Sequence, residues 1–597
     1  MIVEARETIQ REGGYHPCPF PWLTVEVALY AALVALALGV RLAALGRFPL
    51  SLPEADTALA AWRAAQGDVW RPEAYSPLLF GANLLLFYLT RATDGAARLL
   101  PALVGAGLVA LPFAARRTVG RGAALVTAVL LAFAPSWVFF SRANHWPIMA
   151  AALSAALLVA VDRYRQTSLP SDARLVAVTV GLGLLAGPTV FTPLLAAGAL
   201  AVLWTRKHPI LGPARLRGLA VGAASPRNLI VVAGVLLGVG SALWINPGGI
   251  GAAANLAWRW FSALVPAASG PAWSALPVAL LTYEFLTLAL AVVGAIVGLR
   301  RRDPLDRFLV AWAALALVLG TLLGHRGPEW LLDVLLPLVV LAGRGGAYLW
   351  GALRGRVTWA DAAALVAALA LGAFALLEIA AWLHTTQQPF LIYGLFVIGT
   401  LVLAWVGFWL WGQPLQAARV GAIVLALLAV GLTVRATSAV AYQTARDPRE
   451  PLVGRAILPD GRAMEALLTL LSDRMTGDRH ALDASYQRDL DPWAGWYLRE
   501  YPAARGERGV GVGAPGAASG ATVLVTADGA DETGPAGYVG QRFILAETWP
   551  EQPLAIREYL RWFLYRVPVG EVERSYLHVW VQAPGVAQAT QRTSSTP

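Results

Sequence analysis

Two acidic residues lie at the start of a predicted helix, directly after the first apolar segment of the chain. Residues 51–62 read SLPEADTALAAW and contain Glu54 and Asp56, with Pro53 suited to a first helical position. A carboxylate at a membrane surface can act as a general base or as a cation ligand. Acidic side chains in a first helical turn are also stabilised by the helix dipole without any function. Both interpretations stay open at this point.

A second segment, residues 141–146, combines charged and polar side chains between two apolar runs. Arg142 is a candidate to pair with a phosphate or with the acidic pair, because guanidinium groups form strong hydrogen bonds with such anions. Its alternative role is that of an interfacial arginine whose head group reaches toward water. Asn144 and His145 are further candidates for substrate binding, and a structural role is the simpler explanation for His145.

A third segment, residues 324–330, reads GHRGPEW and holds a cation and an anion together. Arg326 is a candidate ligand for a lipid phosphate, with Glu329 beside it, and an ordinary surface ion pair is the alternative. The scattered histidines and the single Cys18 form no metal-binding motif, so we predict no metal site. No cofactor is certain, and a divalent cation at the acidic pair remains an alternative.

The composition determines what kind of protein must position these residues. Of the 597 residues, 57% are hydrophobic and 14% are charged, and the mean hydropathy is +0.57. These values exclude an ordinary cytosolic enzyme, a disordered chain and a disulfide scaffold, and they are typical of a polytopic α-helical membrane protein. The net charge of +10 fits arginine-rich cytoplasmic loops. No basic stripe with interleaved aromatic residues appears, so nucleic acid is not an expected partner.

Apolar segments recur along the first three quarters of the chain and predict about thirteen transmembrane helices. The predicted spans lie near residues 24–45, 97–115, 122–140, 147–162, 174–187, 189–204, 228–246, 276–299, 307–324, 328–350, 358–383, 389–411 and 418–437. Gly187-Pro188 separates the fifth from the sixth, because proline interrupts a helix. The apolar run 77–90 is too short to cross the hydrocarbon core and is left out. Carboxylates within predicted spans default to paired or functional roles; they are Glu284, Asp333 and Glu378.

The distribution of arginine predicts the orientation. With the N-terminus inside, most basic clusters fall in cytoplasmic loops, as the positive-inside rule requires. Residues 1–23 are then a cytoplasmic segment, 24–438 the transmembrane domain with a first external loop at 46–96, and 439–597 an external soluble domain. We expect this multi-pass protein in the plasma membrane.

The polar C-terminal region alternates helix and strand patterns, which predicts a small α/β domain. Residues 461–476, 492–501 and 554–564 have helical patterns, and residues 521–526, 542–546 and 577–582 have strand patterns. Its Gly-rich residues 509–513 do not form a dinucleotide fingerprint, because no strand–turn–helix unit surrounds them.

The order of several short motifs resembles the GT-C superfamily of polyprenyl-phosphate-sugar-dependent glycosyltransferases, near the protein O-mannosyltransferase and aminoarabinose-transferase branch. The motifs are the acidic helix, residues 75–79, 97–103, 116–121 and 141–142. Later motifs resemble the flippase-activity-associated subgroup of N-glycosylation, at residues 283–284, 326–330, 336–338, 341–343, 496–499 and 561–566.

The resemblance implies transfer of a sugar from a polyprenyl-phosphate donor to a glycan or protein acceptor outside the bilayer. Glu54 matches the glutamate of the family's Asp-Glu-Ala motif, the leading aspartate is absent, and Asp56 is the substitute acid. The family's second acidic motif falls where Asn144 and His145 stand here. Glu54 or Asp56 would then act as general base, while Arg142 and Arg326 would stabilise the departing phosphate.

Two alternatives to this enzyme remain open. The missing acids are also consistent with a non-catalytic relative that binds or helps translocate lipid-linked glycans. A secondary transporter would be expected to show an internal repeat and a binding site near the bilayer midplane, and neither is visible in the sequence.

Overall fold

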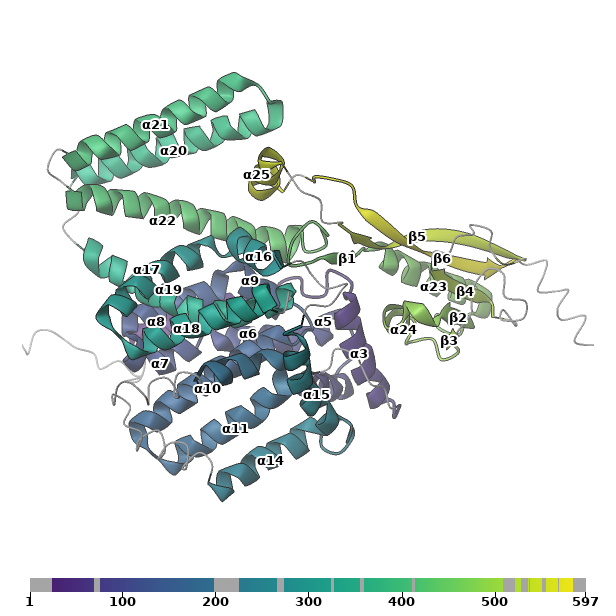
Figure 1. The fold of residues 1–597 in the computed structure, drawn as a ribbon. Coiled ribbons are helices and arrows are strands. Elements are labelled where there is room, and N and C mark those ends of the chain that lie inside the picture. The colour runs from purple at the N-terminus through teal and green to yellow at the C-terminus, as the bar shows by residue number, and fades with distance from the viewer. Residues whose placement is uncertain are drawn as a thin grey trace, which may run out of the picture.

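A bundle of helices carries a smaller sheet domain at one end (Figure 1). The computed structural model describes residues 24–68, 76–197, 225–265, 273–323, 327–354, 359–410, 414–507, 521–527, 535, 537–549, 555–566 and 568–583. The helices of the bundle are α2 (Val25–Leu42), α3 (Leu52–Ala65), α4 (Pro77–Leu89), α5 (Asp94–Ala97), α6 (Leu99–Leu108), α7 (Leu111–Val119), α8 (Arg121–Phe133), α9 (Pro135–Ser141), α10 (Pro147–Thr167), α11 (Pro170–Ala186), α14 (Pro226–Gly240), α15 (Gly249–Ser262), α16 (Ala275–Tyr283), α17 (Phe285–Arg301), α18 (Pro304–Val318), α19 (Leu331–Leu353), α20 (Trp359–Thr385), α21 (Gln388–Leu410) and α22 (Pro414–Ser438).

The chain is a multi-pass membrane protein. Eight of the described helices are long and apolar enough to cross a bilayer, and two bent helix pairs bring the number to ten. Three further predicted spans fall on shorter helices: α11 with 17 residues, α14 with 15, and Pro188–Ala197, which directly precedes residues that the structure does not describe. The total of thirteen crossings therefore stays a prediction. The apolar run 77–90, which was not counted among the predicted spans, forms the 13-residue helix α4.

The predicted span 122–140 is bent by 56° between α8 and α9. Pro135 has no N–H to donate to the carbonyl of Leu131, so the helix is interrupted there. Arg41 of α2 satisfies the freed carbonyls, with Nη2 2.8 Å from the oxygen of Leu131 and Nη1 3.0 Å from that of Ala132. A fully buried arginine thus stabilises the broken end of α8.

The predicted span 276–299 is not one continuous helix. α16 and α17 meet at Glu284 with a bend of 95°. The Glu284 carboxylate accepts hydrogen bonds from the backbone N–H of Ser136, at the N-terminus of α9, and from the hydroxyl of Thr287. This side chain is therefore a partner of two helix ends. Asp333 is likewise buried and accepts a hydrogen bond from the indole of Trp312.

The C-terminal domain contains the small sheet that the sequence predicts. Its strands run in the order β1-β5-β6-β4-β2-β3, with bounds β1 (Arg455–Ile457), β2 (Ala484–Gln487), β3 (Arg505–Glu507), β4 (Val523–Ala527), β5 (Tyr538–Thr548) and β6 (Glu573–Gln582). β2 pairs in parallel with β3 and β4, and the other pairs are antiparallel. α23 (Asp460–Thr476) and α24 (Trp493–Tyr497) contribute to the core beneath it. α24 ends at Tyr497, four residues before the predicted boundary.

Helix α25 (Ile556–Tyr565) lies apart from the sheet although it connects β5 with β6 (Figure 1). It packs beside α20 and the bend between α16 and α17. The hydroxyls of Thr282 and Tyr559 are 3.3 Å apart, and the ring centroids of Phe285 and Phe563 are 6.4 Å apart. This helix was predicted inside a soluble domain, but it joins that domain to the membrane bundle.

The rest of the C-terminal domain is docked on α5 and on the loop between α2 and α3. Asp94 accepts hydrogen bonds from Arg462 at 2.6 Å and from the indole of Trp496 at 2.8 Å. The hydroxyl of Tyr497 accepts a hydrogen bond from the backbone N–H of Leu50. The Leu50 contact fixes the chain immediately before α3, where the acidic residues begin.

Candidate functional site

The Glu54 carboxylate closes the first turn of α3. Ser51 is the N-cap, and both its backbone N–H and its hydroxyl donate to Oε2 of Glu54 at 2.9 Å. This is the capping box that a serine followed three residues later by glutamate forms. Leu52 is the first helical residue, so Pro53 takes the second helical position rather than the predicted first.

Arg98, at the start of α6, binds the same carboxylate with two nitrogens. Its Nε lies 2.6 Å from Oε1 of Glu54 and its Nη2 lies 2.7 Å from Oε2. The remaining donors of Arg98 reach carbonyl oxygens of Leu45, Phe48 and Pro49. The guanidinium therefore holds both the acid and the loop that leads to it.

Glu54 is also bound by the second segment singled out in the sequence. The backbone N–H of Asn144 donates to Oε1 at 2.9 Å, and the Asn144 side-chain amide donates to the Glu54 carbonyl at 3.2 Å. Asn83 donates in turn to the Asn144 side chain at 2.8 Å. Asn144 is buried behind Glu54, and its two contacts connect the α9–α10 turn to α3.

The consequence is a carboxylate that is hard to protonate. Burial alone would raise the pKa of Glu54, but the Arg98 guanidinium and the other hydrogen bonds lower it to about 2. A general base works best with a pKa near the working pH. In this arrangement Glu54 is ionised, saturated with donors and a weak base. The geometry does not favour the base role expected for it from the sequence.

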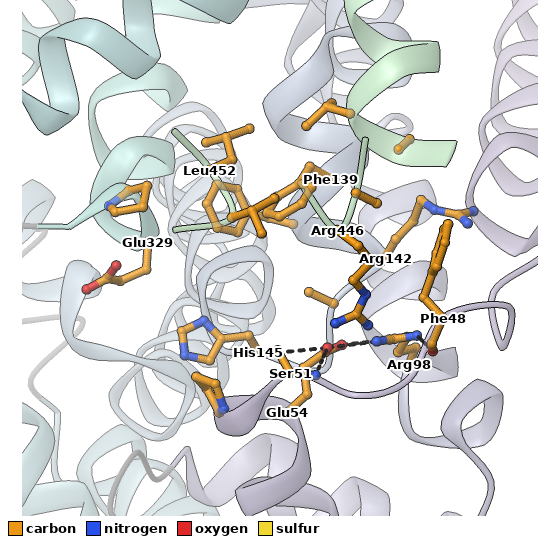
Figure 2. Close-up of a pocket in the computed structure, with 18 of the residues that line it drawn as sticks. Phe48, Ser51, Glu54, Arg98, Phe139, Arg142, His145, Glu329, Arg446 and Leu452 are labelled. Atoms are coloured by element: carbon orange, nitrogen blue, oxygen red, sulfur yellow. Dashed lines mark hydrogen bonds and ion pairs between the residues drawn. The ribbon is translucent and has the colours of Figure 1, made fainter. Parts of the chain in front are cut away.

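A cavity of about 400 Å³ opens between α3, the α9–α10 turn and the segment after α22 (Figure 2). Its walls are largely apolar and aromatic, and half of its polar and charged side chains are arginines. The lining comprises Leu45, Phe48, Ser51, Leu52, Pro53, Glu54, Arg98, Phe139, Phe140, Arg142, Ala143, His145, Pro328, Glu329, Val440, Ala441, Ala445, Arg446, Leu452, Val453 and Arg455.

The cavity brings together four of the seven residues expected at the site: Glu54, Arg142, His145 and Glu329. Asn144 lies behind it. Asp56 is partly exposed on α3, engages another group and does not line the cavity. Arg326 lies outside the described residues.

Arg142 binds the C-terminal end of α2. Its Nη1 lies 2.8 to 3.0 Å from the carbonyl oxygens of Val40, Arg41 and Ala43. A cation is favoured at this end of a helix dipole. Its guanidinium carbon also lies 4.5 Å from the ring centroid of Tyr442. Arg142 therefore borders the cavity while one of its nitrogens is used structurally.

Arg446 is a site residue that the sequence reasoning missed. It points into the cavity near Arg98 (Figure 2), and its guanidinium carbon lies 5.8 Å from the ring centroid of Phe48. Within the described part of the chain it has no hydrogen-bond or ion-pair partner. Burial lowers its pKa to about 10, so it stays charged at neutral pH. The sequence offered no signal for it, because Arg446 lies in the polar stretch after the last predicted span, where arginines are common.

The segment that carries Arg446 is held in place by Glu450, which is fully buried. The Glu450 carboxylate accepts hydrogen bonds from the hydroxyls of Thr444, at 2.7 Å, and Tyr283, and it pairs with Nε of Arg566 at 2.8 Å. It therefore ties the cavity wall to α16 and to the end of α25.

Two cavity groups remain that are not bound to an arginine in the described residues. Burial lowers the pKa of His145 to about 4, so its imidazole is neutral at pH 7 and can accept a hydrogen bond. Glu329 lies on the opposite side of the cavity from Arg98 (Figure 2). No group of three metal-ligating side chains is found within the described ranges.

No protein-family model matches the chain, and no curated protein matches it. Solved structures do. ArnT from Cupriavidus metallidurans bound to undecaprenyl phosphate is similar over 81% of this chain and 86% of its own, with 17% identity and a TM-score of 0.50. The Archaeoglobus fulgidus oligosaccharyltransferase in the apo form is similar over 81% of this chain and 64% of its own, with 12% identity and a TM-score of 0.49. The likeness to ArnT, together with the helical bundle and the small C-terminal sheet, shows that the chain has the fold of the GT-C superfamily of membrane glycosyltransferases.

Proposed function

We propose that the protein transfers a sugar from a polyprenyl-phosphate donor to a glycan or protein acceptor on the external face of the plasma membrane. The observation that carries this proposal is the unpaired Arg446 in a cavity with aromatic walls. The structure of ArnT with undecaprenyl phosphate supports the donor class, since it is the same fold with such a lipid bound. The positive-inside rule supports the orientation.

The cavity suits a ligand with one anionic end and one apolar end. Arg446, together with the free nitrogens of Arg142, offers hydrogen-bond donors and positive charge to a phosphate. Phe48, Phe139 and Phe140 supply apolar surface for the first isoprene units. Arg98 adds no net positive charge, because the Glu54 carboxylate balances it and its donors are already bound.

The acceptor hydroxyl also needs a base. Among the described lining residues Glu329 is the carboxylate that no arginine holds, and we propose it as the base in place of Glu54 or Asp56. Glu329 would take the proton of the acceptor hydroxyl, and the acceptor oxygen would attack the anomeric carbon. The bond from that carbon to the phosphate oxygen breaks, and the lipid phosphate leaves with its electron pair toward Arg446. The sugar is transferred with inversion.

The test uses full-length protein in nanodiscs with a panel of radiolabelled polyprenyl-phosphate hexoses and pentoses. Wild type should transfer label to an acceptor, and Glu329→Gln should lose about 100-fold or more in turnover with donor binding retained. Arg574→Gln, an exposed residue of β6, is the control and should behave as wild type. Full activity of Glu329→Gln would remove Glu329 from the base role.

A second function is favoured by the state of Glu54. Its carboxylate is bound by Arg98, and the position of the family's second acidic motif holds Asn144 and His145. These features fit a protein that binds lipid-linked glycans, or helps translocate them, without cleaving them. Donor binding by wild type without turnover of any sugar in the panel would support this second function and contradict the first.

A further inference from the structure

Helix α25 carries a row of basic side chains that the proposed transfer does not use. Arg557, Arg561 and Tyr565 are each four residues apart, so they share one face of the helix. Nη2 of Arg557 lies 3.3 Å from the carbonyl oxygen of Leu383, and the ring centroids of Tyr565 and His384 are 5.0 Å apart. This face of α25 is therefore turned toward the end of α20.

A third arginine reaches the same face from α22. The guanidinium carbon of Arg435 lies 5.9 Å from the ring centroid of Tyr565. Arg435 also borders a small hollow with Phe563 and Arg566 at the base of α25. Arginines from α22 and α25 thus lie near the end of α20, and Figure 1 shows α25 beside that end.

These arginines have donors that nothing in the described part of the chain satisfies. The Nε atoms of Arg557 and Arg561 are buried without a hydrogen-bond partner. Arg435 forms no hydrogen bond or ion pair with a described residue. Arg566 differs, because Glu450 pairs with it. Buried unpaired donors cost about 1–3 kcal/mol each, and like charges repel, so an anion at this place would relieve both penalties.

The depth of this cluster points to the lipid headgroups. Trp382 and His384 lie in the last turn of the span that ends at Thr385, and the guanidinium of Arg557 lies 5.8 Å from the ring centroid of Trp382. Tryptophan favours the membrane–water boundary. Arg435 is exposed within the outer part of its span, from which an arginine head group reaches the phosphate level.

We propose that Arg435, Arg557 and Arg561 bind the phosphate of an anionic phospholipid of the bilayer, and that this site anchors α25 and the C-terminal domain to the membrane. Basic pockets between membrane helices bind lipid head groups in this way. The site is separate from the cavity of Arg446 and does not depend on the proposed sugar transfer.

The experiment measures lipid binding to the full-length protein by native mass spectrometry, with phosphatidylglycerol and phosphatidylcholine as probes. Wild type should retain phosphatidylglycerol preferentially. Arg557→Gln with Arg561→Gln should weaken this binding about tenfold or more, and Arg435→Gln should weaken it in the same direction from another helix. The matched control is Arg474→Gln with Arg479→Gln, which removes two exposed arginines of the same domain and should have no effect.

Three results would overturn the proposal: no preference for phosphatidylglycerol in wild type, an equal loss in the control pair, or displacement of the lipid by millimolar inorganic phosphate, which would indicate a site for a free anion. Arg435→Gln provides the second test if the double variant of α25 does not fold. Arg446→Gln should keep its phosphatidylglycerol binding, so a failed sugar-transfer assay and a failed lipid-site assay are distinguishable.

Discussion

Arg98 and Arg446 line the same cavity but are held in opposite ways. Arg98 is 5% exposed, and its nitrogens bind Glu54 and three backbone carbonyls. Arg446 faces the same space with no hydrogen-bond partner among the described residues. A guanidinium whose donors are all bound stabilises the fold, whereas an unbound one is available to a ligand. The difference separates the residues that build the cavity from those expected to bind within it.

The largest expected effect comes from removing the buried ion pair between Glu54 and Arg98. Glu54→Gln or Arg98→Gln leaves one buried charge without its partner, which costs about 3–5 kcal/mol. We expect a corresponding loss in the free energy of unfolding, measured by SDS titration of the purified protein. The same change in Arg446 should leave this free energy nearly unaltered. A stable, fully folded Arg98→Gln variant would contradict the structural role.

Acid should weaken the same contact. The pKa of Glu54 is about 2 in the folded protein against 4.5 as its ordinary value. The ionised carboxylate therefore stabilises the fold fully above about pH 4.5, and this contribution, about 3 kcal/mol, is lost as the pH falls toward 2. Unfolding measured across that window should be less pH-dependent in Glu54→Gln than in wild type. Parallel profiles for the two proteins would refute the assignment.

A smaller effect is expected at Arg142, whose guanidinium is only partly bound, unlike that of Arg98 or Arg446. Arg142→Gln removes a cation from the C-terminal end of α2 and should lower stability by about 1 kcal/mol. Because the same side chain borders the cavity, donor binding should weaken as well, by less than for Arg446→Gln. Donor affinity and unfolding measured on one preparation separate the two contributions. Loss of stability alone would make Arg142 purely structural.

The smallest effect is predicted for an exposed pair in the C-terminal domain. Arg574 lies 2.9 Å from Glu547 on the sheet, and its side chain is 51% exposed. Such exposed pairs contribute little to the free energy of unfolding, because water screens the two charges. Arg574→Gln should match wild type in unfolding and in donor binding, and a large loss in either would show that exposure is a poor guide here.

Local patterns predicted the elements better than the contacts between them. Hydrophobic runs indicated the long helices, and Gly187-Pro188 indicated the end of α11, which the structure has at Ala186. The sequence could not show that Glu54 pairs with Arg98, because the partners are 44 residues apart and only the folded loop brings them together. The same limit applies to α25. Its helical pattern was visible, but its position beside α20 depends on tertiary packing.

The candidate site was predicted in part for a similar reason. External loops were expected to be poor in charge, so Glu54, Arg142 and Glu329 were visible as exceptions. Arg446 belongs to that class, but it lies in the polar stretch after the last span, where an arginine is unremarkable. Asp56 lies just beyond the first turn of α3, which holds Glu54, and the helical rotation of about 100° per residue turns it to another face.

The most direct test of the central claim is the affinity of wild type and Arg446→Gln for a polyprenyl phosphate, measured on folded protein in nanodiscs. If Arg446 is the unbound cation of the cavity, the variant should bind the lipid about 10- to 100-fold more weakly, with an unchanged free energy of unfolding. Arg446→Lys, which keeps the charge but not the planar fork, should fall between them. Equal affinity of wild type and Arg446→Gln would contradict the account.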